Sequence, residues 1–342
     1  MKSKPITIKD IARELSISPS TVSRALKDHP DISKETKKLV ADLAKQMDYQ
    51  PNSIALSLRK QKTHTIGVII PELVHFFFAN VISGIEDVAD QAGYNVILCQ
   101  SNESYEKEVR DTHTLISHRV DGLLVSVSKE TTDFDHFNAF IDRGVPIVFF
   151  DRTKEGVKAH QVVVDDLEGS FKAVEHLIEM GCRRIAHLAG PEKLSISSNR
   201  KQGYVDALKK HGMPIDESLI VNCNLGIDVN NGEEVAHSLL TSSDPPDGIF
   251  ANNDLTAIGA MKAAKKLGLN IPGDLAVIGF SNWQMAAMVD PPLSSVHQPG
   301  FEMGQTAARL FIDQLTKDSD HFIPEKVVLK TEVVVRESSR RK

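Results

Sequence analysis

Residues 7–26 of the chain read TIKDIARELSISPSTVSRAL. Apolar side chains recur there at helical spacing, at Ile8, Ile11, Ala12 and Leu15. Thr7 is a suitable N-cap for this helix, and Asp10 lies where a negative charge favours its start. Ser18 and Pro19 predict the N-cap and first residue of a second helix about three residues further on. Two short helices joined by a tight turn are typical of a DNA-binding helix-turn-helix.

A third helix is expected from Ser33. Its apolar residues, predicted to face a small core, are Leu39, Val40, Leu43, Ala44 and Met47. The lysines of the same segment, predicted to face outward, are Lys34, Lys37, Lys38 and Lys45. Lysines on a solvated helix face occur in many small domains, so this helix alone does not decide between DNA binding and simple solvation.

The charge of the chain is unevenly distributed. The 342 residues suggest two or three domains and carry a net charge of −6. Residues 1–62 hold 13 Lys and Arg against 7 Asp and Glu, a net charge of +6, whereas the remainder holds 27 against 39, a net charge of −12. A basic segment before a large acidic body indicates contact with nucleic acid or a membrane at one end.

Several classes of protein fit the sequence poorly. Cys99, Cys182 and Cys223 are scattered and show no CxxC spacing, which argues against a disulfide framework or a zinc site. The sequence lacks a secretory leader and a run of about 18 apolar residues, so we expect a cytoplasmic, nucleoid-associated protein with no membrane partner. No common catalytic or nucleotide-binding motif occurs, and the 13 histidines are not clustered. We therefore expect no enzyme, cofactor or metal.

From residue 64 the chain alternates between strand-like and helix-like segments. The apolar strand-like runs are Ile66–Ile70, Asn95–Cys99, Gly122–Val127, Pro146–Phe150, Arg184–Ala189, Gly248–Ala251 and Leu275–Phe280. The helical stretches include Asn80–Ala92, Glu106–His118, Gly169–Met180, Arg200–His211 and Leu255–Leu267. The pattern restarts near residue 162, which predicts two lobes with doubly wound parallel sheets. Ligands of such sheets bind beyond the carboxyl ends of the strands, here in the cleft between the lobes.

The quoted stretch, followed by YQPNSIALSL at residues 49–58, resembles the lactose-repressor (LacI/GalR) family of bacterial transcription regulators. The resemblance implies an all-α helix-turn-helix DNA-binding domain over residues 1–49 and a hinge helix and linker over 50–63. It implies an effector-binding and dimerisation domain over 64–342, with a fold like that of periplasmic sugar-binding proteins. Paired half-sites on DNA require paired modules, so a homodimer is expected.

The resemblance also assigns candidate DNA contacts. Pro19, Ser20 and Arg24 occupy positions that choose operator bases, and arginine has the fork geometry that binds guanine. The candidates for phosphate contacts are Thr7, Ser18, Thr21 and Ser23. The candidates in the hinge are Asn52, Ala55, Leu58 and Arg59. Leu58 matches a leucine that wedges into the minor groove, and Arg59 is the nearest cation because Ala55 is followed by leucine rather than arginine.

Candidate effector contacts follow from the same resemblance: Phe77, Phe78, Asp151, Arg200, Asn253 and Asp254. Asp254 is equally suited to cap a helix, and the two phenylalanines to pack in a core. Many relatives have two aspartates where this chain has Ser281 and Asn282, beside its single tryptophan, Trp283. Ser281 and Trp283 are therefore further candidates. The neutral pair indicates an effector that is less demanding of hydroxyl contacts or that carries its own negative charge.

The limits of the two lobes are expected at local breaks in the pattern. Three crossings are predicted near residues 161, 291 and 324, with the last strand, Val327–Val335, in the second lobe. The first lobe then spans about 64–161 and 292–324, and the second about 162–291 and 325–340. No leucine heptad follows that would form a tetramer.

These features predict a repressor of carbohydrate-utilisation genes that binds double-stranded operator DNA. A sugar-like effector would act as inducer or corepressor by changing the angle between the lobes. One alternative is a global catabolite-control regulator that also responds to a phosphoprotein partner. A solute-binding protein of a transport system is the alternative from another class, and the basic head argues against it.

Overall fold

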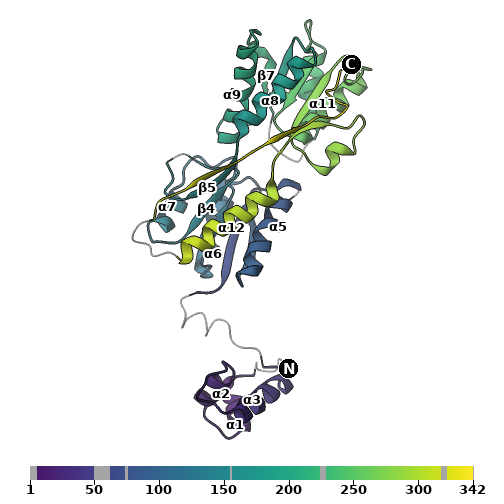
Figure 1. Cartoon of the computed structure of the whole chain (residues 1–342). Coiled ribbons are helices and arrows are strands. Elements are labelled where there is room, and N and C mark those ends of the chain that lie inside the picture. The colour runs from purple at the N-terminus through teal and green to yellow at the C-terminus, as the bar shows by residue number, and fades with distance from the viewer. Residues whose placement is uncertain are drawn as a thin grey trace. The chain divides into compact units, whose positions relative to one another are not determined.

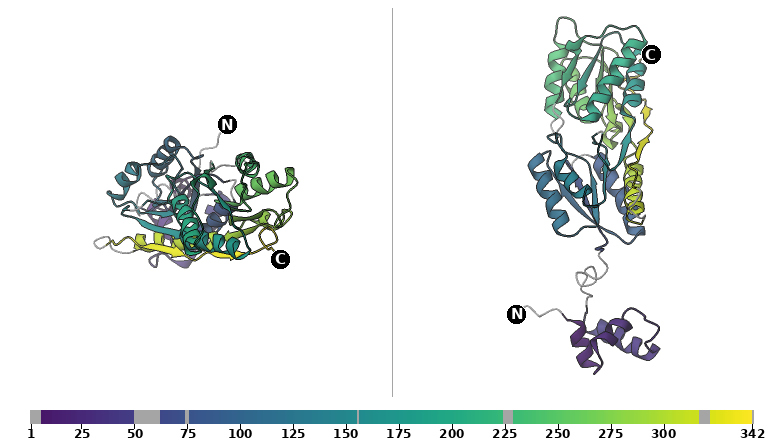
Figure 2. Two further views of the ribbon diagram at one scale, coloured as in Figure 1. Left: turned by 90° about the horizontal axis from the view of Figure 1, so that it is seen from above. Right: turned by 90° about the vertical axis from the view of Figure 1, so that its left-hand side faces the viewer.

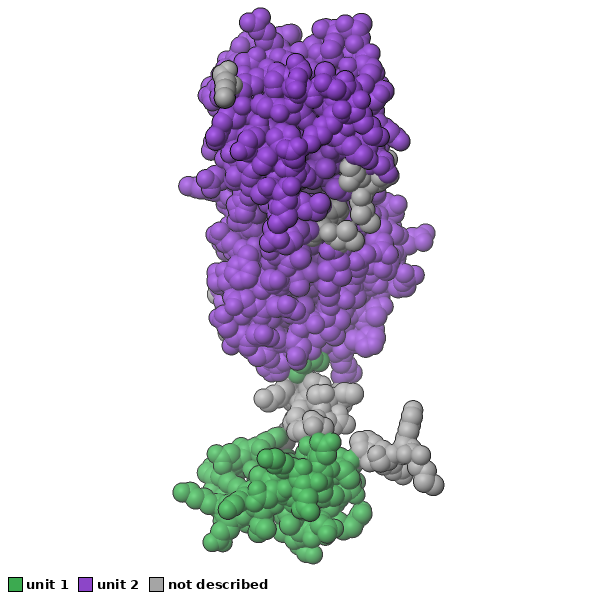
Figure 3. Space-filling view, turned by 90° about the vertical axis from the view of Figure 1, so that its right-hand side faces the viewer, with its two compact units in different colours: residues 1–63 green, residues 64–342 purple. Residues whose placement is uncertain are grey.

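The structure, a computed structural model, describes residues 6–49, 62–73, 76–154, 156–223, 229–316 and 322–341. The chain divides into two compact units, residues 1–63 and 64–342 (Figure 3). In the described ranges, no helix is long and apolar enough to cross a membrane.

The smaller unit is a three-helix domain (Figure 1). Its helices are α1 (Ile8–Glu14), α2 (Pro19–Ala25) and α3 (Lys34–Gln46). Their buried side chains form one small core of Ile11, Ala12, Val22, Ala25, Val40 and Ala44. The prediction that Leu39 faces this core is wrong, because its side chain is 59% exposed. Val40 and Ala44, one helical turn apart, are the buried positions of α3, and Leu39 lies about 100° around the helix from Val40.

The first lobe of the larger unit is a six-stranded parallel sheet in the order β11-β5-β4-β3-β1-β2. Helices α5 and α12 pack together on one face, whereas α6 and α7 cover the other. The elements are β1 (Thr65–Ile70), α5 (Phe76–Gln91), β2 (Asn95–Gln100), α6 (Tyr105–Ser117), β3 (Gly122–Val125), α7 (Asp135–Ile141), β4 (Ile147–Phe150), β5 (His160–Val164), α12 (Gly300–Thr316) and β11 (Lys326–Leu329).

The second lobe repeats this plan with the sheet order β12-β10-β9-β8-β6-β7, in which only β12 is antiparallel to its neighbour among the described strands. Helices α8 and α9 pack on one face and α10 and α11 on the other (Figure 2). The elements are α8 (Asp166–Glu179), β6 (Ile185–Ala189), α9 (Ser195–Lys210), η1 (Glu217–Leu219), β7 (Ile220–Asn222), α10 (Val229–Leu240), β8 (Gly248–Ala251), α11 (Asp254–Lys266), β9 (Ala276–Ser281), η2 (Gln284–Ala287), β10 (Ser294–His297) and β12 (Glu332–Val334).

The chain crosses between the lobes three times, each time later than the sequence predicted. β5 belongs to the first sheet and β10 to the second, so the first two crossings follow residues 164 and 297 rather than lying near 161 and 291. The predicted strand Val327–Val335 is split, because β11 pairs with β5 in the first lobe and β12 pairs with β10 in the second. The local breaks at Pro291 and Pro324 each precede a strand rather than mark a change of sheet.

Candidate functional site

The polar residues of α2 are available at the surface of the smaller unit. Pro19, Ser20 and Arg24 are exposed, and Thr21 and Ser23 are half-buried, while Val22 and Ala25 face the core. Among the described residues, none forms a hydrogen bond or ion pair with the Arg24 guanidinium. Its donors are therefore available to an external acceptor.

Two of the predicted phosphate contacts are engaged in helix caps. The Ser18 hydroxyl oxygen accepts a hydrogen bond from the Thr21 backbone N–H at 3.1 Å and lies 2.7 Å from the Ser20 hydroxyl. The Thr7 backbone N–H and hydroxyl both donate to one Asp10 carboxylate oxygen, at 2.9 and 2.6 Å. These two hydrogen bonds lower the pKa of Asp10. Both caps orient their helices, and the hydroxyls remain at the surface.

The predicted hinge contacts Asn52, Ala55, Leu58 and Arg59 lie outside the described residues.

A cavity in the larger unit is lined by side chains of both lobes. The lining residues are Phe77, Phe78, Asp151, Arg152, Ile196, Arg200, Asn253, Ser281, Trp283 and Gln298. They come from the start of α5 and the end of β4 in one lobe, from α9 and the ends of β8 and β9 in the other, and from the second crossing. Seven of the eight predicted effector residues therefore meet in one place. The cavity holds about 60 Å³ of free space, less than the roughly 300–1,000 Å³ of typical ligand sites, so a sugar-sized ligand requires it to widen.

Arg200 is fixed in this cavity by three contacts. Its Nε and Nη2 atoms each lie 2.7 Å from one carboxylate oxygen of Asp166. Its Nη1 donates to the backbone carbonyl of Asn252 at 2.5 Å, and the guanidinium lies 3.7 Å from the ring centre of Phe280. Burial raises the pKa of Asp166, and the Arg200 charge opposes that rise. The guanidinium is thus held in one orientation with part of its donor set facing the cavity.

Asp151 and Arg152 form the opposite wall. Asp151 follows β4 with a backbone φ of +59°, in the left-handed region that few non-glycine residues adopt. Its side chain is buried, which raises its pKa to about 6 against the opposing charge of Arg152. Arg152 Nη1 donates to both carboxylate oxygens of Glu103, at 2.9 and 2.8 Å. The sequence hypothesis missed Arg152, although its position directly after Asp151 was a usable signal.

The structure places Asp254 behind the cavity wall, whereas its neighbour Asn253 lines the cavity. The Asn253 side-chain oxygen caps α11 by accepting from the Thr256 N–H at 2.8 Å. Asp254 is fully buried, and its two oxygens accept from the Ser295 hydroxyl at 2.5 Å and the Trp283 backbone N–H at 2.7 Å. Burial raises its pKa to about 7. Asp254 therefore does not line this cavity, and its carboxylate holds the Trp283 backbone.

The Ser281 and Asn282 side chains have separate roles. Ser281 has a φ of +112°, and its hydroxyl donates to the Gln298 side-chain oxygen at 2.7 Å, so both residues face the cavity. Asn282 instead accepts a hydrogen bond from Arg336 Nη2 at 2.8 Å and is not among the lining residues. Only one position of the neutral pair therefore faces the cavity. Gln298 was missed by the sequence hypothesis because the second crossing was misplaced.

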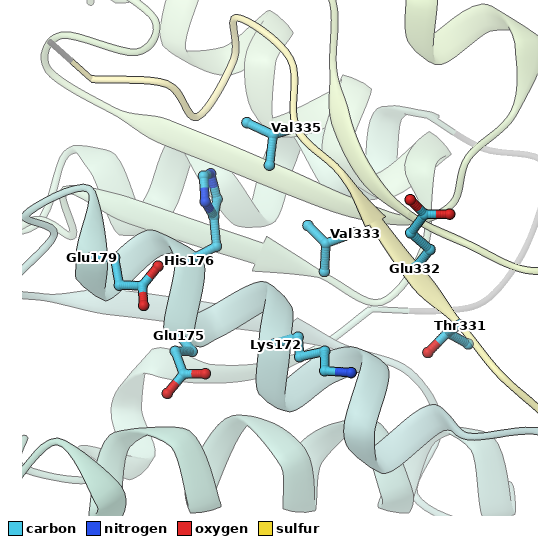
Figure 4. Close-up of a pocket in the computed structure, with 8 residues that line it drawn as sticks. All are labelled: Lys172, Glu175, His176, Glu179, Thr331, Glu332, Val333 and Val335. Atoms are coloured by element: carbon cyan, nitrogen blue, oxygen red, sulfur yellow. The ribbon is translucent and has the colours of Figure 1, made fainter.

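A second cavity, of about 320 Å³, lies on the surface of the second lobe between α8 and the β12 segment (Figure 4). Half of its lining residues are charged, but Glu175 is already paired with Lys210 at 2.8 Å and His211 at 2.9 Å. The His176 ring contacts the Ser339 hydroxyl at 2.8 Å. Within the described ranges, no group of three or more His, Cys, Asp or Glu residues is placed to hold a metal ion. None of the predicted site residues lies here.

Comparison with known proteins finds a family match within each of the two units. A model described as bacterial regulatory proteins, lacI family, matches residues 7–52, and one described as a periplasmic binding protein-like domain matches 174–339. Catabolite control protein A of Priestia megaterium is 34% identical, covering 92% of this chain and 94% of that protein. The ribose operon repressor of Halalkalibacterium halodurans is also 34% identical, covering 98% and 97%.

Among solved structures, the lac repressor dimer bound to its operator and the anti-inducer ONPF matches with a TM-score of 0.86 and 25% identity, covering 98% of this chain and 99% of that one. The expected fold class, a helix-turn-helix head and a two-lobed α/β body, is confirmed. The chain belongs to the lacI family of bacterial regulatory proteins.

Proposed function

We propose that this protein is a repressor of carbohydrate-utilisation genes that binds operator DNA through α2. Its operator affinity would be set by a sugar or sugar derivative held between the two lobes. The observation that carries the proposal is the cavity to which both lobes contribute buried polar side chains, Asp151 and Arg152 from one and Arg200 from the other. The name of the ribose operon repressor, which covers nearly the whole chain, supports the carbohydrate assignment.

The narrow cavity supplies the physical link between ligand and DNA. Because its free space is about 60 Å³, a bound sugar requires a different lobe arrangement or different side-chain positions. A ligand that binds one lobe arrangement more tightly shifts the population toward it. We propose that this shift reaches the paired heads through residues 50–63, as the family resemblance implies.

A homodimer on an approximately palindromic operator is the expected assembly. Two copies of α2 can then read two half-sites, and the similar lac repressor structure is a dimer bound to operator. The protein would act in the cytoplasm, associated with the nucleoid. Relatives that cover nearly the whole chain are named as repressors rather than as enzymes, which supports a regulatory role.

A global catabolite-control regulator is a second candidate, favoured by the 34% identity to catabolite control protein A. The genes whose promoters the protein occupies distinguish the two. Binding confined to one sugar-uptake and catabolic cluster supports the local repressor, whereas binding at many unlinked operons supports the global regulator.

The proposed function is tested by selecting a duplex that binds from a random-sequence pool and titrating the protein against it. Addition of saturating neutral sugars, sugar phosphates and nucleobases should show at least one compound that changes the operator Kd severalfold. An operator affinity that none of these compounds changes would remove the effector from the proposal.

A further inference from the structure

The cavity between the lobes contains two guanidinium groups, and both are already neutralised by carboxylates. Arg152 forms a two-oxygen contact with Glu103, and Arg200 a two-nitrogen contact with Asp166. All four side chains are more than nine-tenths buried. Buried pairs of this kind are not screened by solvent, so neither cation is available to balance a further negative charge.

A third carboxylate faces the cavity without such a partner. Asp151 is 5% exposed, and its closest cationic nitrogen is Arg152 Nε at 3.9 Å, beyond hydrogen-bonding distance. Among the described residues, none donates a hydrogen bond to the Asp151 side chain. Two guanidiniums and three carboxylates therefore leave the surroundings of the cavity with an excess of negative charge.

The cavity also presents hydrogen-bond donors that belong to neutral groups or to neutralised pairs. Arg152 Nε and Gln298 Nε2 are buried and have no hydrogen-bond partner among the described residues. Arg200 uses its Nε, Nη1 and Nη2 in the contacts described above, and five N–H groups leave two donors over. Donors beside a carboxylate that accepts no hydrogen bond from the described residues match hydroxyl groups, each of which both donates and accepts.

We infer that the cleft selects a neutral, polyhydroxylated ligand and rejects phosphorylated or carboxylated derivatives of the same sugar. Asp151 would accept two hydroxyl protons, and Arg152, Arg200 and Gln298 would donate to hydroxyl or ring oxygens. The inference rests on the proposed function in that a small molecule occupies this cleft. It argues against the negatively charged effector that was one of the two alternatives for the Ser281–Asn282 pair.

Release of Arg152 to an anionic ligand would leave a buried charge behind. Glu103 also accepts a hydrogen bond from the Lys129 backbone N–H at 2.7 Å, which holds its carboxylate in place. If Arg152 turned to a phosphate, Glu103 would lose its cation while remaining buried. Breaking a buried pair in this way is strongly unfavourable, and the Asp151 charge adds repulsion.

The sharpest test makes the cleft accept an anion. In Glu103→Gln the amide keeps the shape of the side chain but frees the Arg152 charge. We expect inorganic phosphate to raise the midpoint of thermal unfolding of Glu103→Gln by several degrees more than chloride of equal ionic strength does. In the wild type, the difference between the shifts caused by phosphate and by chloride should be smaller. Glu175→Gln, which removes a carboxylate paired with two cations outside the cleft, is the control and should behave as the wild type.

Wild-type protein keeps the inference testable if Glu103→Gln does not fold. Binding is measured by calorimetry for glucose against glucose 6-phosphate and glucuronate, and for ribose against ribose 5-phosphate. The inference predicts that the neutral member of a bound pair binds at least tenfold more tightly. A phosphate or uronate that binds as tightly as its neutral parent overturns it and leaves the proposed function intact.

Equal responses of the wild type and a folded Glu103→Gln to phosphate would also overturn the inference. If no sugar of either class binds, and none changes operator affinity, the proposed function itself fails and the inference with it.

Discussion

Replacement of Asp254 by asparagine is expected to stabilise the second lobe at alkaline pH. Asp254 is fully buried, and burial raises its pKa to about 7 from the ordinary value of 3.8. In Asp254→Asn the side-chain oxygen can accept from the Trp283 N–H, and the amide N–H can donate to the Ser295 hydroxyl, which also accepts from the Asn282 N–H. The substitution removes the ionisation and leaves the Ser295 hydroxyl proton without its acceptor, a cost that does not depend on pH.

The sign and size of the effect follow from linkage. A carboxyl whose pKa is raised by folding contributes stability that is fully present below pH 3.8 and is lost as the pH rises to about 7. The loss is complete above that pH and amounts to about three pKa units, or about 4 kcal/mol. Between pH 5 and pH 8 the wild type should therefore lose roughly 2 to 3 kcal/mol relative to Asp254→Asn.

Urea unfolding followed by tryptophan fluorescence reports on the second lobe, which contains Asp254, because Trp283 in that lobe is the single tryptophan of the chain. For a urea slope of about 2–3 kcal/mol per M, the gap between the two midpoints should widen by about 1 M from pH 5 to pH 8. Asp142→Asn, which alters an exposed carboxylate of the first lobe, is the control and should leave the gap constant. A gap that does not depend on pH, or an Asp254→Asn protein less stable than wild type at pH 8, would refute the reasoning.

Three further predictions follow from the packing and from the two sites. Gly304→Ala should reduce the free energy of unfolding by about 1–3 kcal/mol and lower the unfolding temperature by several degrees, because a side chain there would collide with the Val81 carbonyl where α12 crosses α5. Gly273→Ala is the control, because an added methyl group meets only ordinary contacts there and should leave the unfolding temperature unchanged. Arg24→Ala should weaken binding to the selected operator by about 1–3 kcal/mol in an anisotropy titration and relax sequence preference, whereas loss of affinity equal for all sequences would indicate a phosphate contact. Affinity for a neutral sugar should fall as the pH drops below about 6, because the Asp151 carboxylate is then protonated. Calorimetry of the wild type at pH 5 and pH 7.5 should show this fall. A pH dependence of the same size in Asp151→Asn would mean that another group causes the fall.

Local signals in the sequence were sufficient for the smaller unit. The hydroxyl caps at Ser18 and Ser33 act through contacts to residues three positions away. The sequence predicted the cap at Ser18 and a helix from Ser33, and both appear in the structure. The exposure of Leu39 was harder to predict from the sequence, because the adjacent apolar residues Leu39 and Val40 cannot both face the small core of this unit.

The path of the chain through the larger unit was harder to predict, because sheet membership depends on distant partners. The apolar run at Val327–Val335 gives no sign that its first part pairs with β5 and its second with β10. The same limit applies to the cleft. Asn253 and Asp254 are adjacent in sequence, yet the start of α11 turns one toward the cavity and the other beneath it.

The charge balance of the cleft also depends on long-range contacts. Glu103 lies 49 residues before Arg152, and Asp166 lies 34 residues before Arg200, so neither pair is visible as a motif. The basic head and acidic body were visible in composition. The neutralisation of the two guanidiniums, on which the charge of the proposed ligand depends, could be recognised only from the folded structure.

The central claim is a coupling between the cleft and operator DNA. Its most direct test measures the Kd for the selected operator with and without a saturating neutral sugar, and the Kd for that sugar with and without operator. Reciprocity requires both constants to change by the same factor, which we expect to be about 5-fold to 150-fold. A sugar that binds the wild type, loses affinity in Asp151→Asn and yet leaves the operator Kd unchanged would contradict the account.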